Sequence, residues 1–172
     1  RRYFADDAVY EVKAESFGRI AEKNHRHSAN NPNSQFRDIY SLDDIMGAKM
    51  VHEPLTKLQC CPTSDGGAAA IVASEGFVHE HGLEDQAVEI IGMSMHTDFP
   101  SSFESNSDMS FVGFDMSKAT AADVYEQSGH GPEEVDVIEL HDCFSANEMI
   151  TYEALGLCKE GGAGELIDSG AV

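Results

Sequence analysis

The chain has 172 residues, which fits one domain or part of a larger protein, and 41% of them are hydrophobic. With 15 Gly, 5 Pro and 9 Phe, the composition is that of a packed protein and excludes disorder over most of the length. No stretch approaches the roughly 18 uninterrupted apolar residues that a membrane-spanning helix needs, and the first residues lack the apolar run of a signal peptide.

The formal net charge of −20 is confined to the part of the chain after residue 60. That part holds 22 acidic side chains and only 2 basic ones, Lys118 and Lys159, whereas residues 1–60 hold 9 of each sign. Because the acidic part repels polyphosphates, we expect no nucleic-acid partner. A phosphorylated ligand would have to place its charged end on residues 1–60, on backbone amides, or on another chain segment or subunit. A solubilising acidic surface or an adaptation to salt would account for the same charge.

In the first third of the chain, the residue pattern predicts two helices. Residues 5–27 carry apolar side chains between charged ones, which is typical of an amphipathic helix. The turn formers of residues 28–34 predict a loop. Ser41, placed before two acidic residues, then favours a capped short helix over residues 42–50.

From residue 60 the pattern alternates between strands and helices. A Gly-rich turn over residues 63–67 leads into residues 68–73, where flanking glycines and an Ile-Val tail favour a tightly packed strand, although alanine runs can also be helical. Residues 77–82 predict a short helix and its end, residues 88–93 a second strand, and residues 100–107 a loop.

The last third of the chain completes the alternation. Residues 118–128 predict a helix closed by a glycine, and residues 135–140 predict a third strand. Ser145 and Glu148 match the capping box of a helix start, and an apolar stripe follows until a glycine ends the helix. Together these segments predict an α/β protein.

The candidate catalytic residues, His141 and Cys143, lie where the third predicted strand gives way to the capped helix. Open α/β sheets bind ligands at that edge. Free amides and the helix dipole stabilise a thiolate there, so we expect the pKa of Cys143 to be lowered. His141, two residues earlier on an extended segment, would project to the same side, to bind a developing oxyanion or share a proton with the thiol. The two side chains can then converge on one reacting carbon.

Structural roles explain the same residue types. Buried free cysteines are usually inert, and a histidine at a strand end is often a satisfied structural group. Cys158 and the adjacent Cys60 and Cys61 fit structural roles, and four cysteines in this length form no disulfide scaffold, which favours a reducing compartment. The turn over residues 63–67 can serve either a close-lying ligand or helix packing.

Other site types lack support in the sequence. The histidines of residues 25–27 and of residues 79–81 are spaced i, i+2, which points their rings to different helix faces, so we expect no zinc site. No Walker-type loop, dinucleotide fingerprint or Gly-x-Ser-x-Gly nucleophile elbow is present.

Three segments carry a resemblance to a known family. They are residues 24–32 (NHRHSANNP), residues 58–70 (LQCCPTSDGGAAA) and residues 138–148 (IELHDCFSANE). They resemble thiolases of the sterol carrier protein 2 type, which are peroxisomal 3-ketoacyl-CoA thiolases, and the similarity covers essentially the whole chain. The most diagnostic piece is the His-Asp-Cys-Phe block of residues 141–144, which replaces the Asn-Glu-Ala-Phe block of other thiolases.

The resemblance implies a thiolase-like layered αβα fold and thiolytic cleavage of a 3-ketoacyl-CoA to acetyl-CoA or propionyl-CoA and a shortened acyl-CoA. It makes His141 part of an oxyanion hole for a thioester oxygen and Cys143 the acid/base cysteine. Coenzyme A is then a substrate, no metal or redox cofactor is expected, and the protein would be a peroxisomal homodimer, or cytoplasmic in a prokaryote.

The resemblance also implies an incomplete fold. Residues 1–82 resemble the end of the N-terminal thiolase half with its loop region, and residues 83–172 the start of the C-terminal half. In the family the nucleophilic cysteine lies before the region matching Arg1, and the Gly-His-Pro histidine lies beyond the region matching Val172. We therefore expect no turnover from these residues alone.

Two other functions stay open. One is a thiolase-fold lyase that cleaves steroid side-chain CoA thioesters by a retro-aldol step; Cys143 argues against it, because that step needs a base but no second thiol. The other is a non-catalytic protein that binds acyl-CoA or lipid.

Overall fold

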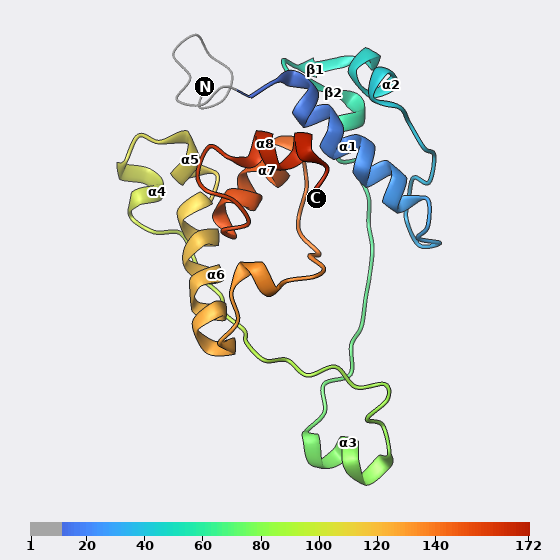
Figure 1. The fold of residues 1–172 in the computed structure, drawn as a ribbon, viewed down its shortest axis with the longest axis vertical. Coiled ribbons are helices and arrows are strands. Elements are labelled where there is room, and N and C mark those ends of the chain that lie inside the picture. Colours follow the sequence, from blue (N-terminus) through green and yellow to red (C-terminus); the bar gives the residue numbers. More distant parts are fainter. Residues whose placement is uncertain (1–11) are drawn as a thin grey trace.

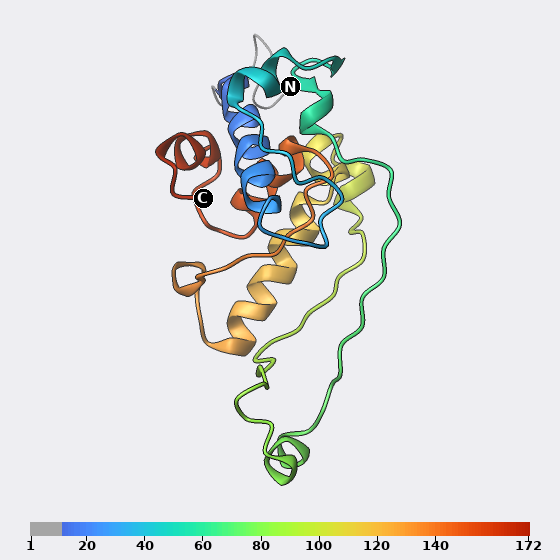
Figure 2. The same ribbon diagram turned by 90° about the vertical axis from the view of Figure 1, so that its right-hand side faces the viewer.

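The computed structural model describes residues 12–172 and divides them between a cluster of helices and an extended arm, residues 62–91 (Figure 1). The elements in chain order are α1 (Ala14–Ser28), α2 (Leu42–Gly47), β1 (Met50–His52), β2 (Leu55–Thr56), the 3-10 turn η1 (Lys57–Gln59), α3 (Glu75–His81), α4 (Ser101–Glu104), α5 (Asp108–Phe111), α6 (Phe114–Ser128), the 3-10 turn η2 (Pro132–Glu134), α7 (Ser145–Ala154) and α8 (Ala163–Ser169). In two perpendicular views α3 stands apart from the other helices, at the end of two long segments (Figures 1 and 2). None of the helices in residues 12–172 is long and apolar enough to cross a membrane.

The hydrophobic core forms where α1 packs against α7 and α8. Its buried residues are Val12, Phe17, Ile20, Met149, Tyr152, Ala163 and Ile167. Burying an aliphatic or aromatic side chain of this size contributes about 1.5 to 3 kcal/mol, so these few residues supply most of the hydrophobic stabilisation of the cluster.

The structure confirms the amphipathic helix α1 but starts it at Ala14, because Lys13 has extended backbone. Residues 5–11 of the predicted helix lie outside the described residues. The neighbouring helix α2 approaches α1 closely at Gly18, where an added Cβ would lie 2.7 Å from Met46 Sδ.

The predicted cap of α2 is also confirmed. The Ser41 hydroxyl accepts a hydrogen bond from Asp44 N (3.2 Å), and Asp44 Oδ2 accepts one from Ser41 N (3.0 Å). The helix ends at Gly47 rather than at residue 50, because Met50 already begins β1. Strands β1 and β2 pair antiparallel and form the one sheet of the described chain.

The three predicted strands over residues 68–73, 88–93 and 135–140 are wrong as local structure: no strand or helix forms there. Most of their apolar side chains stand in solvent, with Ile71 96% exposed and Val88 90% exposed, whereas Leu140 packs against the core. A strand needs an adjacent strand to pair its N–H and C=O groups, and within residues 12–172 none lies beside these segments. The apolar pattern indicates a preference for burial but does not provide the neighbouring strand.

The chain that follows the arm instead runs along α6. Met93 N donates a hydrogen bond to Gln127 Oε1 (3.1 Å), and Ser94 Oγ donates one to Asp123 Oδ2 (2.9 Å). Polar side chains of a helix thus take the place of a strand neighbour.

The remaining helix predictions differ from the structure mainly at their ends. Helix α3 is confirmed and stops at Gly82, whose φ of 62° favours glycine. Helix α6 is confirmed, ends at Gly129 and begins at Phe114, four residues before the predicted start. The expected loop over residues 100–107 is wrong in part, because α4 forms immediately after Pro100.

Candidate functional site

The segment of residues 141–144 lies directly before α7, and Phe144, with φ −145° and ψ 151°, is the residue that precedes the first helical turn. Two hydrogen bonds hold its backbone. Asn147 Nδ2 donates to the carbonyl oxygen of His141 (2.6 Å), and Cys61 N donates to the carbonyl oxygen of Cys143 (2.9 Å). The first contact comes from α7 itself and the second from a segment far away in the sequence, so the segment is fixed from both sides.

Both predicted catalytic residues are accessible to different degrees: His141 is exposed and Cys143 is half-buried. Among the hydrogen bonds of residues 12–172, none joins the two side chains. The residue between them, Asp142, lines the large cavity described below. The convergence of His141 and Cys143 on one reacting carbon stays a prediction.

The expected lowering of the Cys143 pKa is wrong. Burial raises the pKa of the Cys143 thiol, and the nearby Cys61 and Asp142 raise it further, while backbone amides of Phe144 and Cys143 oppose the shift. Removal from water outweighs the helix start because the thiolate is the form that loses hydration. The thiol therefore stays protonated at neutral pH.

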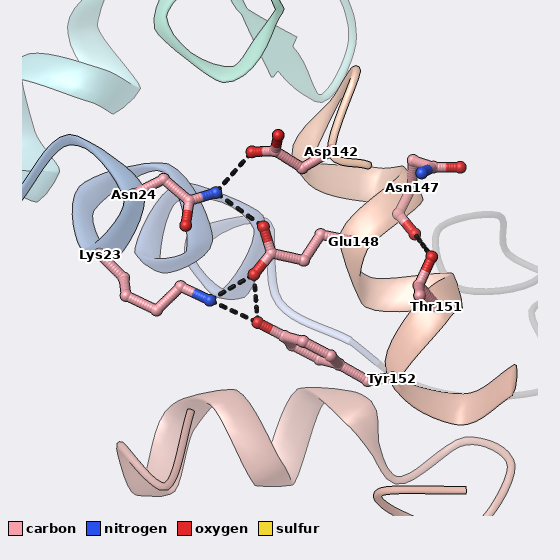
Figure 3. A network of polar contacts seen from close by, with 7 residues as sticks. All are labelled: Lys23, Asn24, Asp142, Asn147, Glu148, Thr151 and Tyr152. Atoms are coloured by element: carbon pink, nitrogen blue, oxygen red, sulfur yellow. Dashed lines mark hydrogen bonds and ion pairs between the residues drawn. The ribbon is translucent and has the colours of Figure 1, made fainter. Parts of the chain in front are cut away.

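The predicted capping box at the start of α7 is wrong as well. Ser145 is the first helical residue, and its hydroxyl donates to Gln59 Oε1 (2.9 Å) instead of capping the helix. The side chain of Glu148 is directed to α1, where it pairs with Lys23 (Figure 3). A buried carboxylate is stable only with a charged partner, and that requirement outweighs a local cap.

Glu148 is the centre of a buried polar network that joins α1 to α7 (Figure 3). It is 2% exposed, and its carboxylate accepts hydrogen bonds from Lys23 Nζ and from the Tyr152 hydroxyl. Lys23 Nζ also lies 2.6 Å from the Tyr152 hydroxyl oxygen. Burial and the neighbouring Glu148 raise the pKa of Tyr152, so the phenol stays protonated and donates to the carboxylate.

Asn24 extends this network to the candidate catalytic segment. Its Nδ2 donates to Glu148 Oε2 (2.6 Å) and to Asp142 Oδ2 (2.6 Å). Burial raises the pKa of Asp142, and Glu148 raises it further, while bonds from the Asp142 backbone and Asn24 and the nearby His141 oppose the shift. One amide of α1 thus holds two carboxyl groups at the start of α7.

An open cavity of about 960 Å³ lies beside this network. Its walls come from α1, from residues 34–36, from residues 58–62 and from the unpaired residues 135–140, and Asp142, Ser145 and Glu148 contribute polar groups. The volume is that of a site for a sizeable organic ligand.

The other sequence candidates lie outside the network. An added Cβ at Gly66 or Gly67 would meet nothing within 4 Å, so the helix packing considered for that turn is not formed among the described residues. Cys158 is half-buried, and burial raises its pKa to about 11. Sequence reasoning missed Asn24 and Cys61 as neighbours of residues 141–144. The only signal was that both lie in segments that carry the family resemblance.

The chain is similar to several known proteins. Residues 100–172 match the family described as thiolase C-terminal domain-like. The chain is 62% identical over 162 residues to sterol carrier protein 2 of Rattus norvegicus, covering 94% of this chain and 30% of the rat protein. It is 37% identical over 148 residues to the benzoylsuccinyl-CoA thiolase subunit BbsB of Thauera aromatica, covering 86% of this chain and 37% of that protein.

A solved structure, the Ltp2-ChsH2(DUF35) aldolase, superposes with a TM-score of 0.75 at 26% identity, covering 94% of this chain and 42% of that chain. The chain thus spans about 30% of the length of the rat relative. The comparisons confirm the thiolase-like α/β fold, and the chain is highly similar over most of its length to proteins of the sterol carrier protein 2 type.

Proposed function

We propose that the complete gene product cleaves 3-ketoacyl-CoA by thiolysis to acetyl-CoA or propionyl-CoA and a shortened acyl-CoA, with His141 and Cys143 as catalytic residues. The observation that carries this proposal is the Cys143 thiol, half-buried at the start of α7, with its pKa raised and its neighbours Asp142 and Ser145 lining a large cavity.

The chemistry of the reaction explains why such a thiol is useful. Thiolysis breaks the bond between C2 and C3 of the substrate and leaves its electron pair on C2, which must then receive a proton. A thiol with a raised pKa holds that proton at neutral pH, so Cys143 can donate it to C2. The resulting thiolate can then take a proton from the incoming CoA thiol, whose sulfur attacks the acyl group left on the enzyme's nucleophile.

His141 would stabilise the charge that develops during this step. The electron pair on C2 is shared with the thioester oxygen, and a hydrogen bond from the exposed imidazole to that oxygen lowers the barrier. Thiol and imidazole chemistry is sufficient for the reaction, so we propose coenzyme A as a substrate and no metal or redox cofactor.

The charge distribution favours α1 as the place for the CoA phosphates. Arg19 and Arg26 lie along one face of this helix and line a small cavity of about 160 Å³, together with Lys23, whose ammonium is already paired with Glu148. The acidic part of the chain after residue 60 repels phosphate.

From the resemblance to thiolases of the sterol carrier protein 2 type we further propose a peroxisomal homodimer, with the two thiolase halves divided near residue 82.

Two other functions have specific support. The solved neighbour is an aldolase by name, which favours a retro-aldol lyase, and the name of the rat relative favours lipid binding without catalysis. Product analysis on the complete gene product separates the three. CoA-dependent release of acetyl-CoA or propionyl-CoA supports thiolysis, CoA-independent release of a free ketone or aldehyde supports the lyase, and binding without any product supports the carrier.

The role of Cys143 is tested by Cys143→Ala in the complete gene product. Loss of the acid/base group should lower turnover by about three orders of magnitude, which is the usual contribution of a positioned proton donor and acceptor. Titration should still detect acyl-CoA binding. Cys158→Ala is the matched control, because this half-buried thiol lies outside the site. Equal turnover of the wild type and Cys143→Ala would remove the acid/base assignment.

A further inference from the structure

Two cysteine-bearing segments run antiparallel beside the candidate catalytic residues. Cys60 and Phe144 form an isolated antiparallel bridge, and Cys61 N donates to the carbonyl oxygen of Cys143 (2.9 Å). The register therefore sets Cys61 directly opposite Cys143.

Side chains alternate between the two faces of such a pair, so those of Cys61 and Cys143 share one face and that of Cys60 points to the other. The Cys60 thiol donates to the carbonyl oxygen of Thr56 (3.3 Å), away from Cys143. Of the two adjacent cysteines, only Cys61 thus faces Cys143, the proposed acid/base thiol.

The spacing of this pair suits a disulfide. Directly opposed residues joined by ladder hydrogen bonds have Cα atoms about 5.5 Å apart, inside the roughly 4.4 to 6.8 Å that a disulfide spans. Their Cβ atoms need to approach each other by about 1 to 2 Å. The bridge is isolated, so the backbone beyond Cys61 is free of ladder bonds that would resist this closure.

Accessibility and proximity agree with this geometry. Cys61 is exposed, so a small oxidant can reach its sulfur, whereas Cys143 is half-buried. The neighbouring Cys61 also helps to raise the pKa of Cys143, after the larger effect of burial, in agreement with this register.

We propose that Cys61 is a redox partner of Cys143, and that oxidation by hydrogen peroxide joins the two sulfur atoms in a reversible disulfide that withdraws the Cys143 thiol. The Cys61 thiolate attacks one peroxide oxygen, the O–O bond breaks, and sulfenic acid and hydroxide form. The Cys143 sulfur then gives up its thiol proton, attacks the Cys61 sulfur and expels a second hydroxide. The two thiol protons convert both hydroxides to water, so two thiols are oxidised and one peroxide is reduced.

A dithiol reverses the reaction by exchange and is itself oxidised to a disulfide. In a reducing compartment such a bridge is transient, which is the usual form of regulatory disulfides. The formation of the bridge is independent of the proposed thiolysis; only its inhibitory effect rests on that function.

The test is peptide mapping of the complete gene product after mild peroxide treatment and blocking of free thiols. Cleavage after acidic residues, which spares the Glu53–Pro54 bond, places Cys60 and Cys61 together in residues 45–65, Cys143 in residues 143–148 and Cys158 in residues 154–160, so the mass shows which of these peptides are linked. We expect a linked pair of peptides 45–65 and 143–148 and a fall of about tenfold in Cys143 alkylation, restored by dithiothreitol.

Matched variants identify the partner within the pair. Cys61→Ser should abolish the linked peptide and keep Cys143 open to alkylation after peroxide, whereas Cys60→Ser should behave as the wild type. Absence of the linked peptide from the oxidised wild type would overturn the proposal without reference to any variant, and so would its persistence in Cys61→Ser.

Activity is measured separately on the reduced protein. A protein that forms the bridge but never releases acetyl-CoA or propionyl-CoA would refute the proposed function and leave the disulfide standing. A reduced protein that catalyses thiolysis but forms no bridge would do the reverse.

Discussion

The helical cluster and the arm are built from equally clear local signals but reach very different degrees of burial. In the cluster, α1, α7 and α8 share a core in which Ile20 is 1% exposed. In the arm, α3 is capped at both ends, by Ser74 and by Gly82, yet contains no buried residue. The comparison teaches that capping and turn residues are enough to shape a helix, whereas burial depends on partners that other parts of a chain must provide.

The largest effect should come from the charge pair inside the cluster. Glu148→Gln leaves Lys23, whose side chain is 16% exposed, without its counter-charge, so we expect a loss of about 3 to 5 kcal/mol in the free energy of unfolding. The matched control is Glu160→Gln, because Glu160 pairs with Lys118 at the surface and should cost below about 1 kcal/mol. Denaturant unfolding measures both, and equal losses would contradict the contrast.

Two isoleucines sharpen the comparison between cluster and arm. Ile20→Ala should cost about 2 to 5 kcal/mol in any folded form, because it leaves a cavity in the core. Ile71 is 96% exposed in the arm, so Ile71→Ala should be silent in residues 1–172 alone. In the complete gene product we expect it to cost as much as Ile20→Ala, because an apolar segment of this kind requires a neighbouring strand. A silent substitution there would mean that the arm truly stands in solvent.

A smaller effect is expected at the cap of α2. Ser41→Ala removes the side-chain acceptor of the Asp44 amide and should lower the free energy of unfolding by about 1 kcal/mol. Ser74→Ala removes the equivalent acceptor of the Phe77 amide in the arm and serves as the control. Because α3 buries nothing, its unfolding should be local, and amide exchange in α3 should quicken with little change in the global midpoint.

The smallest effect concerns the pH dependence of stability at Asp142. Burial raises its pKa in the folded state, so its contribution to stability is present below the ordinary carboxyl pKa and is lost as pH rises through the raised value. Asp142→Asn resembles the protonated form and should melt slightly above the wild type at neutral pH, with the difference closing toward about pH 4. Melting curves at several pH values measure this, and a difference that grows on acidification would contradict the sign.

Local signals explain which features could be predicted. The cap formed by Ser41 and Asp44 and the glycine stops after α3 and α6 involve residues within a few positions of each other, and all are confirmed. The capping box at Ser145 and Glu148 carries the same kind of signal and fails, because the chain brings Lys23 to the carboxylate from 125 positions away. The spacing of residues within a short segment gives no sign of a competing partner from so far away in the sequence.

The same limit applies to the candidate site. His141 and Cys143 could be selected because a strand-to-helix junction favours chemistry, and the residue types are informative. Their neighbours Asn24 and Cys61 come from distant segments, and only the folded register brings them to residues 141–144. The direction of the Cys143 pKa shift depends on burial, which also follows from the fold and not from the helix start alone.

The bond from Asn24 to Asp142 has a consequence for how the protein is made. The two residues are 118 positions apart in the sequence. During synthesis Asn24 therefore leaves the ribosome long before Asp142, whose carboxylate accepts its hydrogen bond. The candidate catalytic segment can therefore take its final shape only once α7 has emerged. A shorter polypeptide that ends before Asp142 would lack the partner of Asn24 and also α7 and α8, which complete the core around α1.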